Sequence, residues 1–400
     1  MWLRFGNIFL FFFIPFWLSA QKTPWKNVPM DSLKDMKDVA RQILHKDSKA
    51  EEDKRRQRLV QMSVVPAVGY TLQTGFAAVV SANAIIYKKD RKPGDNTIPS
   101  TVRFNISYSQ KHQVIAPLKS VLFFKNNRTI LASDWRYLKY PTYTYGLGMH
   151  TGPQDSTLLN YQYLKLQSSI LFQVHPNIYI GVGYELDYFW NIQQVYEQQT
   201  KSDFQMYGSE STSVSSGPVF NFRIDTRDNP VNAYRGTYTN IILTPRFKFL
   251  GSNTNWTSLI LDFRSYIRFP GRSPNILAFW SYNWLTLSGR PPYLMLPTTG
   301  WDFSTGRGYI QGRFRSNNML DAETEYRIQL TRNGLLGMVI FTNFQSFSNI
   351  DTWHFPSIAT GGGLGLRIKI NKYSRTNIDI DYGWGRQGSR GFFVNLGEVF

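Results

Sequence analysis

The residues that could do acid–base, nucleophilic or metal chemistry are scattered along this chain. The five histidines have no metal-ligand spacing between them (His45, His112, His150, His175 and His354). The sequence contains no nucleophile elbow, no His-Glu-x-x-His pair and no phosphate-binding loop. The glycine run at 361–365 lacks the spacing of a dinucleotide site, and we interpret it as strand glycines. We therefore expect no enzyme activity, no cofactor and no metal.

Acidic side chains recur at alternate positions, which favours ion pairing over catalysis. In 320–330 they are Asp321, Glu323 and Glu325, with apolar or small residues between them. Structural networks of paired charges also gather such groups. We therefore predict ion pairs with arginines on neighbouring segments. The residues in this prediction are Glu185, Asp187, Asp262 and Asp381, with Arg223, Arg264 and Arg268 as partners.

From Ser63 to the end of the chain, hydrophobicity follows a period of two, which predicts β-strands with two different faces. Side chains alternate across a strand, so one face can meet lipid while the other meets a polar interior. The residues expected to face lipid are Ile180, Val182, Leu186, Ala322, Tyr326, Ile378 and Ile380. Those expected to face inward include Glu185, Glu325 and Asp379. We expect Val182→Arg to impair assembly and Glu185→Arg to be tolerated.

The composition indicates a membrane barrel more than a secreted sandwich, which is the alternative all-β class. Aromatic residues make up 16% of the chain, as in barrels with aromatic girdles, while the mean hydropathy of −0.32 excludes a bundle of membrane helices. Cysteine is absent, so no disulfide framework holds the fold. The net charge of +18 suits anionic lipid head groups or a basic lumen better than nucleic acid, which an exported chain rarely meets.

Residues 1–20 predict a secretory signal peptide. Arg4 precedes an apolar run from Ile8 to Leu18, and Ser19 and Ala20 form a small-residue cleavage site. The run is shorter than the roughly 20 apolar residues of a membrane helix, which makes an uncleaved anchor the weaker alternative. Residues 21–63 are expected to form a periplasmic segment, with one amphipathic helix or a loosely held leader at 31–58.

Residues 64–400 are expected to form a sixteen-stranded antiparallel transmembrane β-barrel, an even number as bacterial single-chain barrels require. Short turns near Asn126, 175–177, 270–273, 332–334 and 372–375 then alternate with long loops, as such barrels show on their two sides. The predicted strands are 64–71, 75–88, 101–110, 112–124, 128–139, 160–174, 178–190, 212–225, 235–248, 255–269, 274–288, 318–331, 334–348, 359–371, 376–386 and 391–400.

Four segments resemble the BamA/TamA superfamily of outer-membrane barrels, also called the bacterial surface antigen family. They are the opening hairpin around 64–75, the mid-barrel turn 225–236, the motif Gly306-Arg307-Gly308-Tyr309 in the sixth outer loop, and the terminal strand 391–400 with its final aromatic. The resemblance covers 64–400. It implies a short member without the family's periplasmic domains, because only residues 21–63 precede the first strand.

The resemblance also implies that the loop motif folds back into the lumen. Arg307 would then contact Glu325 and, secondarily, Glu323, because a guanidinium in a partly dehydrated lumen needs a carboxylate. A solvent-exposed Arg307 is the alternative. Asn343 lies near a position that is usually acidic in the family, which implies that only one carboxylate partner remains for Arg307.

The family resemblance implies a barrel in the outer membrane of a Gram-negative bacterium, in contact with outer-membrane lipids and with other proteins of an assembly complex. The expected role is insertion or translocation of proteins or lipids during outer-membrane biogenesis. The alternative is a passive small-solute pore or structural barrel. If the wall opens sideways, we expect the opening at the seam between the first and last strands, which contain Val64, Pro66, Val68, Gly391, Val394 and Phe400.

Overall fold

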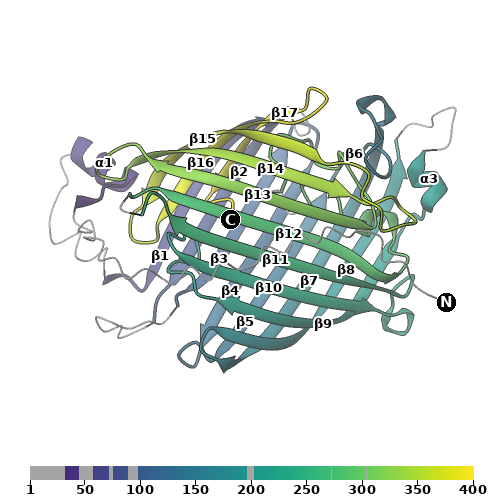
Figure 1. The fold of residues 1–400 in the computed structure, drawn as a ribbon, viewed down its shortest axis with the longest axis horizontal. Coiled ribbons are helices and arrows are strands. Elements are labelled where there is room, and N and C mark those ends of the chain that lie inside the picture. The colour runs from purple at the N-terminus through teal and green to yellow at the C-terminus, as the bar shows by residue number, and fades with distance from the viewer. Residues whose placement is uncertain are drawn as a thin grey trace.

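The computed structural model describes residues 32–44, 57–71, 75–88, 98–195, 202–271, 273–301 and 305–400. The expected signal peptide and most of 21–63 lie outside these residues. The described chain forms one sheet of seventeen strands, rolled into a nearly closed barrel (Figure 1). No helix in these ranges is both long and apolar enough to span a bilayer.

Consecutive strands pair antiparallel, except that β5 pairs with β7. β6 is a three-residue piece beside β7, so sixteen strands make the wall. The strands are β1 (Val60–Thr71), β2 (Gly75–Ile86), β3 (Ser100–Ser109), β4 (Val114–Phe124), β5 (Thr129–Lys139), β6 (Thr142–Thr144), β7 (Thr157–His175), β8 (Ile178–Gln194), β9 (Ser213–Asp225), β10 (Gly236–Arg246), β11 (Trp256–Arg268), β12 (Ile276–Gly289), β13 (Asn318–Gln329), β14 (Leu336–Phe347), β15 (Ala359–Asn371), β16 (Thr376–Trp384) and β17 (Arg390–Leu396).

The expected fold is confirmed, with differences at its two ends. β1 begins at Val60 rather than at residue 64, and β17 ends at Leu396 rather than at Phe400. The predicted helix at 31–58 is shorter in the structure, where α1 (Met36–Ile43) is capped by the side chain of Asp35. Residues 45–56 lie outside the described part of the chain. Short helices also occur in the connections: η2 (Pro153–Asp155), α3 (Asp203–Tyr207), η3 (Lys248–Leu250) and η4 (Tyr293–Met295).

The two ends of the barrel differ in their connections. Tight turns join most of the strands at one end, which we call the short-turn end, and two of them use the left-handed backbone of Asn126 and Asn177, with φ of 55° and 65°. The other end, the long-loop end, has the connections 140–156, 195–212 and 290–317. Figure 1 shows α1 at the short-turn end and α3 and β6 at the long-loop end.

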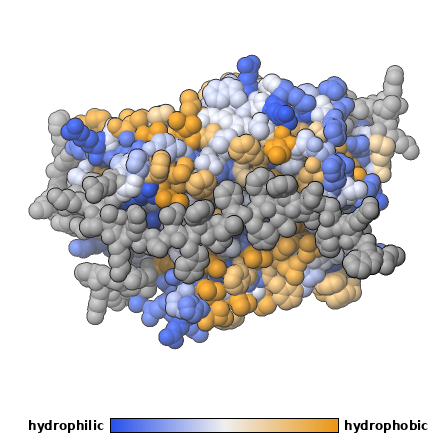
Figure 2. Space-filling model, in the orientation of Figure 1, coloured by the Kyte–Doolittle hydropathy of each residue, from blue (hydrophilic) through white to orange (hydrophobic). Residues whose placement is uncertain are grey.

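Outward and inward side chains of the wall have opposite chemistry, as the period of two predicts. On β8, Val182 is 57% exposed on the outer surface, whereas Glu185 is 4% exposed and faces inward. The same holds for exposed Ile180 and Ile380 against buried Asp379. On the face shown in Figure 2, hydrophobic residues gather over the middle of the strands and hydrophilic residues toward the ends.

An arginine on the outer face should impair assembly of the barrel. We expect Val182→Arg to destabilise the protein by about 2–4 kcal/mol, the cost of a cation near the middle of a bilayer. The measurement is the midpoint of urea unfolding in vesicles. The matched control is Asn105→Arg, because Asn105 faces the lumen on β3 and is only half-buried there. Equal effects of the two substitutions would refute the assigned register.

Candidate functional site

The described part of the loop 290–317 enters the lumen from the long-loop end, and the Gly306–Tyr309 motif is buried there. Arg307 is 1% exposed. Gly308 has φ of 101°, and a Cβ there would lie 2.6 Å from the main-chain oxygen of Trp384, so this close passage requires glycine. The hydroxyl of Tyr309 donates to the oxygen of Thr360 at 2.6 Å. The motif is therefore fixed against the start of β15 and the end of β16.

Three carboxylates surround the guanidinium of Arg307. Its Nη2 lies 2.6 Å from Glu325 and 3.3 Å from Glu323, and its Nη1 lies 2.7 Å from Asp381. A buried guanidinium requires such partners, because attraction to them offsets the loss of hydration. The structure thus brings Arg307 together with both predicted glutamates. It adds Asp381 on β16, which the sequence analysis did not assign to Arg307.

Asn343 contacts the backbone of Arg307 and not its guanidinium. Its Nδ2 donates to the main-chain oxygen of Arg307 at 2.7 Å, so it holds the backbone of the motif. Glu325 makes the shortest of the three contacts, as expected, but the expectation that only one carboxylate partner remains for Arg307 was wrong, because Glu323 and Asp381 supply two further carboxylates.

A second arginine, Arg367 on β15, extends this network toward the short-turn end. It pairs with Asp379 at 3.2 Å and with Glu398 at 2.9 Å, and it also contacts Asp381. Arg327 on β13 pairs with Glu325 at 2.7 Å. The network therefore links the loop motif, three strands and the chain after β17.

Residues 397–400 turn into the lumen instead of completing the last strand. Gly397 has φ of 91°, a left-handed conformation that ends the ladder. Glu398 accepts hydrogen bonds from Arg367 and, at 3.0 Å, from Asn232. The ring of Phe400 lies 5.2 Å from that of Trp280 on β12. The prediction of a strand to Phe400 was wrong because these contacts draw the tail inward.

The mid-barrel turn 226–235 also folds into the short-turn end of the lumen. Asn229 Oδ1 accepts from the main-chain nitrogens of Val231 and Asn232 at 2.8 and 2.9 Å, which stabilises a tight turn. Asp228 pairs with Arg375 at 2.8 Å. Val231 is buried next to Gly397. The turn and the tail together fill this end of the lumen.

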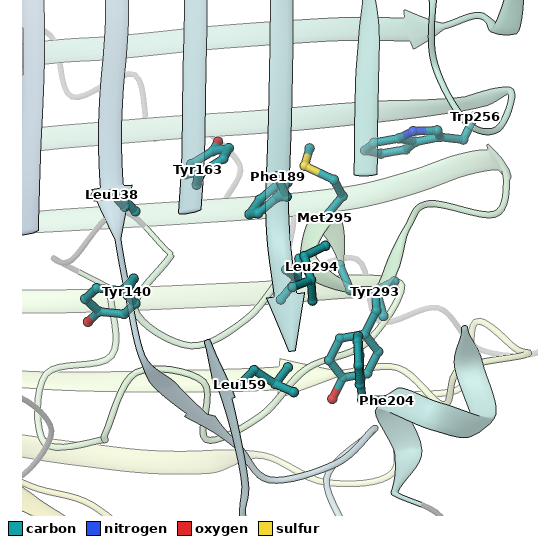
Figure 3. Close-up of a cluster of buried hydrophobic side chains, with 12 residues drawn as sticks. Leu138, Tyr140, Leu159, Tyr163, Phe189, Phe204, Trp256, Tyr293, Leu294 and Met295 are labelled. Atoms are coloured by element: carbon teal, nitrogen blue, oxygen red, sulfur yellow. The ribbon is translucent and has the colours of Figure 1, made fainter. Parts of the chain in front are cut away.

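Aromatic and aliphatic side chains fill the long-loop end (Figure 3). Tyr293, Leu294 and Met295 of η4 pack with Tyr163 and Phe189, whose rings stack with centroids 4.1 Å apart. These side chains are all buried. Close packing of this kind leaves no space for a wide water-filled channel there.

Other inward charges are also paired, partly as predicted. Arg264 pairs with Asp262 at 2.8 Å, as expected. Glu185 instead pairs with Lys165 at 2.9 Å and with Arg246, neither of which was predicted. These contacts change the expectation for Glu185→Arg from tolerance to destabilisation, since a third cation would enter this buried cluster. Asp187 joins the same cluster, Asp381 belongs to the network around Arg307 and Arg367, and Arg223 bonds to Asn240. Arg268 lies over the ring of Tyr234.

Within the described ranges, no group of His, Asp and Glu has the arrangement of a metal site.

The seam between β1 and β17 differs from every other junction in the wall. The two strands lie side by side, yet no ladder joins them in the described residues. β17 has seven residues and β1 has twelve, one of them Pro66, which cannot donate a ladder hydrogen bond. Val64, Val68 and Val394 are exposed on the outer face of the seam, and Gly391 pairs with Gly383 of β16.

The barrel is similar in fold to solved structures. It contains the inserted loop, the inward tail and the seam without a ladder. BamA from Haemophilus ducreyi lacking POTRA domains 1–3 has a TM-score of 0.52 at 13% identity, over 89% of this chain and 77% of that chain. This chain has the barrel fold of BamA. CdiB from Acinetobacter baumannii (TM-score 0.51, 12% identity, 85% and 60% of the two chains) and CdiB from Escherichia coli (0.51, 9%, 86% and 68%) share it.

The likeness to BamA and CdiB is one of fold. A scan against family models finds no match, and a search of curated proteins finds none either. The chain spans less than two thirds of the Acinetobacter CdiB chain and somewhat more of the other two. The expected barrel fold is confirmed, and the comparisons show the fold alone.

Proposed function

We propose that this protein is an outer-membrane barrel of a Gram-negative bacterium that takes part in inserting or translocating proteins or lipids through its seam. The observation that carries the proposal is that β1 and β17 meet without a ladder. Backbone groups inside a bilayer must be hydrogen-bonded, so a barrel wall normally closes completely. A junction without a ladder is therefore the place where the wall opens at the lowest cost.

An open seam would expose backbone groups to which a client polypeptide can bind. The edges of β1 and β17 would present unpaired N–H and C=O groups, onto which an extended polypeptide can add as a further strand. The apolar outer face around Val68 and Val394 leads such a client into the lipid. We propose outer-membrane lipids and other proteins of an assembly complex as the partners of this barrel.

The filled lumen favours this function over a passive pore. The loop motif is held by Arg307, the hydrophobic cluster around Tyr293 fills the long-loop end, and residues 397–400 fill the opposite end. A sixteen-stranded wall is wide enough for an aqueous channel only when its interior is empty.

We expect low and flickering conductance when the protein is reconstituted into planar bilayers. The physical reason is that segments from both ends occupy the lumen, so ions cross only when these segments move. The measurement is single-channel current at low voltage, with an open trimeric porin as the positive control. A large and steady conductance would instead support the pore function.

A further inference from the structure

α1 presents its polar face to the barrel and its apolar face to the surroundings. Asp35 and Asp38 are buried against the short-turn end. The apolar stripe of α1, by contrast, is exposed, and Ile43 reaches 71%. The stripe consists of Met36, Ala40, Ile43 and Leu44. Surface helices of globular proteins usually bury their apolar side against the protein core. The stripe of α1 does not contact the core, so it requires an apolar environment outside the barrel.

The polar face fixes the position of α1 on the rim. Asp38 pairs with Lys372 in the β15–β16 turn at 3.1 Å, and Asp35 accepts a hydrogen bond from the main-chain nitrogen of Lys372 at 3.0 Å. The main-chain nitrogen of Lys34 donates to Asn333 in the β13–β14 turn at 2.9 Å. These contacts tie the helix to two neighbouring turns, and they leave the stripe directed away from them.

The stripe continues the lipid-facing surface of the wall. Lys37 Nζ donates to the main-chain oxygen of Met62 on β1 at 3.2 Å, so α1 lies beside the start of this strand. Leu59, Val60 and Met62 are all exposed there. The exposed apolar surface therefore runs from the outer face of β1 to the helix.

We propose that α1 is an in-plane membrane anchor whose apolar stripe lies in the leaflet at the short-turn end. Interfacial helices of this type place an apolar face at the boundary between head groups and acyl chains, with basic residues beside it. Lys34, Lys37 and Arg41 supply these basic residues, which suit anionic phospholipid head groups. The anchor thereby couples the leaflet to β1, one edge of the seam. The inference rests on the proposed membrane location of the barrel.

The absence of cysteine allows single-site labelling of the full chain. A polarity-sensitive dye is attached at Ile43→Cys, or at Leu44→Cys as a second stripe position, in vesicles of phosphatidylethanolamine and phosphatidylglycerol. Gln42→Cys, exposed on the polar side of the same helix, is the matched control. Val182→Cys reports on the lipid-facing wall.

We expect blue-shifted emission and quenching by lipids with brominated chains at Ile43 and Leu44, with emission as in water at Gln42. Removing phosphatidylglycerol should weaken the quenching at the stripe but not at Val182. Aqueous emission at both stripe positions with a quenched Val182 would overturn the anchor, and a docking surface for a periplasmic protein would take its place. Aqueous emission at Val182 as well would instead refute the membrane location on which the inference rests.

Discussion

Arg307→Ala is expected to release the loop 290–317 from the lumen. The substitution leaves Glu323, Glu325 and Asp381 without the cation that all three contact. Removing one partner of a buried ionic group typically costs about 3–5 kcal/mol, because the remaining charges are left uncompensated. Arg367 already contacts Asp381 and partly compensates, so the lower half of this range is expected.

The measurement is limited proteolysis of the reconstituted protein, followed by the position of the first cleavage. In the Arg307→Ala protein, the loop should become sensitive to protease while the wall remains resistant. Arg290→Ala is the matched control, because Arg290 lies at the exposed start of the same loop and donates to the oxygen of Tyr207. Cleavage of both variants at the same rate would show that Arg307 does not anchor the loop.

The wall of the barrel was predictable from the sequence because alternation acts residue by residue. Each inward charge such as Glu325 has outward neighbours such as Tyr326, and a shift of one residue would reverse every side chain. The same argument placed Glu323 and Glu325 on the side that Arg307 reaches. Local patterns therefore determined the register and two of the three acidic partners.

The contacts across the lumen were not predictable in this way. Asp381 lies on β16, whereas Glu325 lies on β13, and the curvature of the wall brings both to Arg307. The tail was predicted as strand because Phe392, Val394, Leu396 and Phe400 fall on one face at a period of two, although Glu398 interrupts that apolar face. The left-handed Gly397 and the hydrogen bonds of Glu398 override that pattern.

The reversed orientation of α1 shows a similar limit. The helical period of the α1 sequence predicts a polar and an apolar face but does not indicate which of them contacts the barrel. The acidic face contacts the barrel because the buried Lys372 provides an ion pair and a main-chain hydrogen-bond donor. Sequence signals for such a contact are weak, since the partners are more than three hundred residues apart.

A covalent lock across the seam is expected to abolish function. Val68→Cys and Val394→Cys place thiols on the outer faces of β1 and β17, and neighbouring outward positions two residues away are scanned to match the register. The native chain has no cysteine, so the disulfide forms only between the introduced residues. Each single-cysteine variant serves as a control for the substitution itself.

The decisive measurement is the activity of this locked barrel in vesicles, with and without a reducing agent. Two probes are used: a urea-denatured small outer-membrane barrel, whose insertion is followed by its gel shift, and a fluorescent phospholipid, whose transfer between leaflets is followed by quenching. The account predicts that the reduced protein accelerates at least one process over protein-free vesicles, and that oxidation returns the rate to the protein-free value. Undiminished activity of the oxidised barrel, or no acceleration by the reduced one, would contradict it.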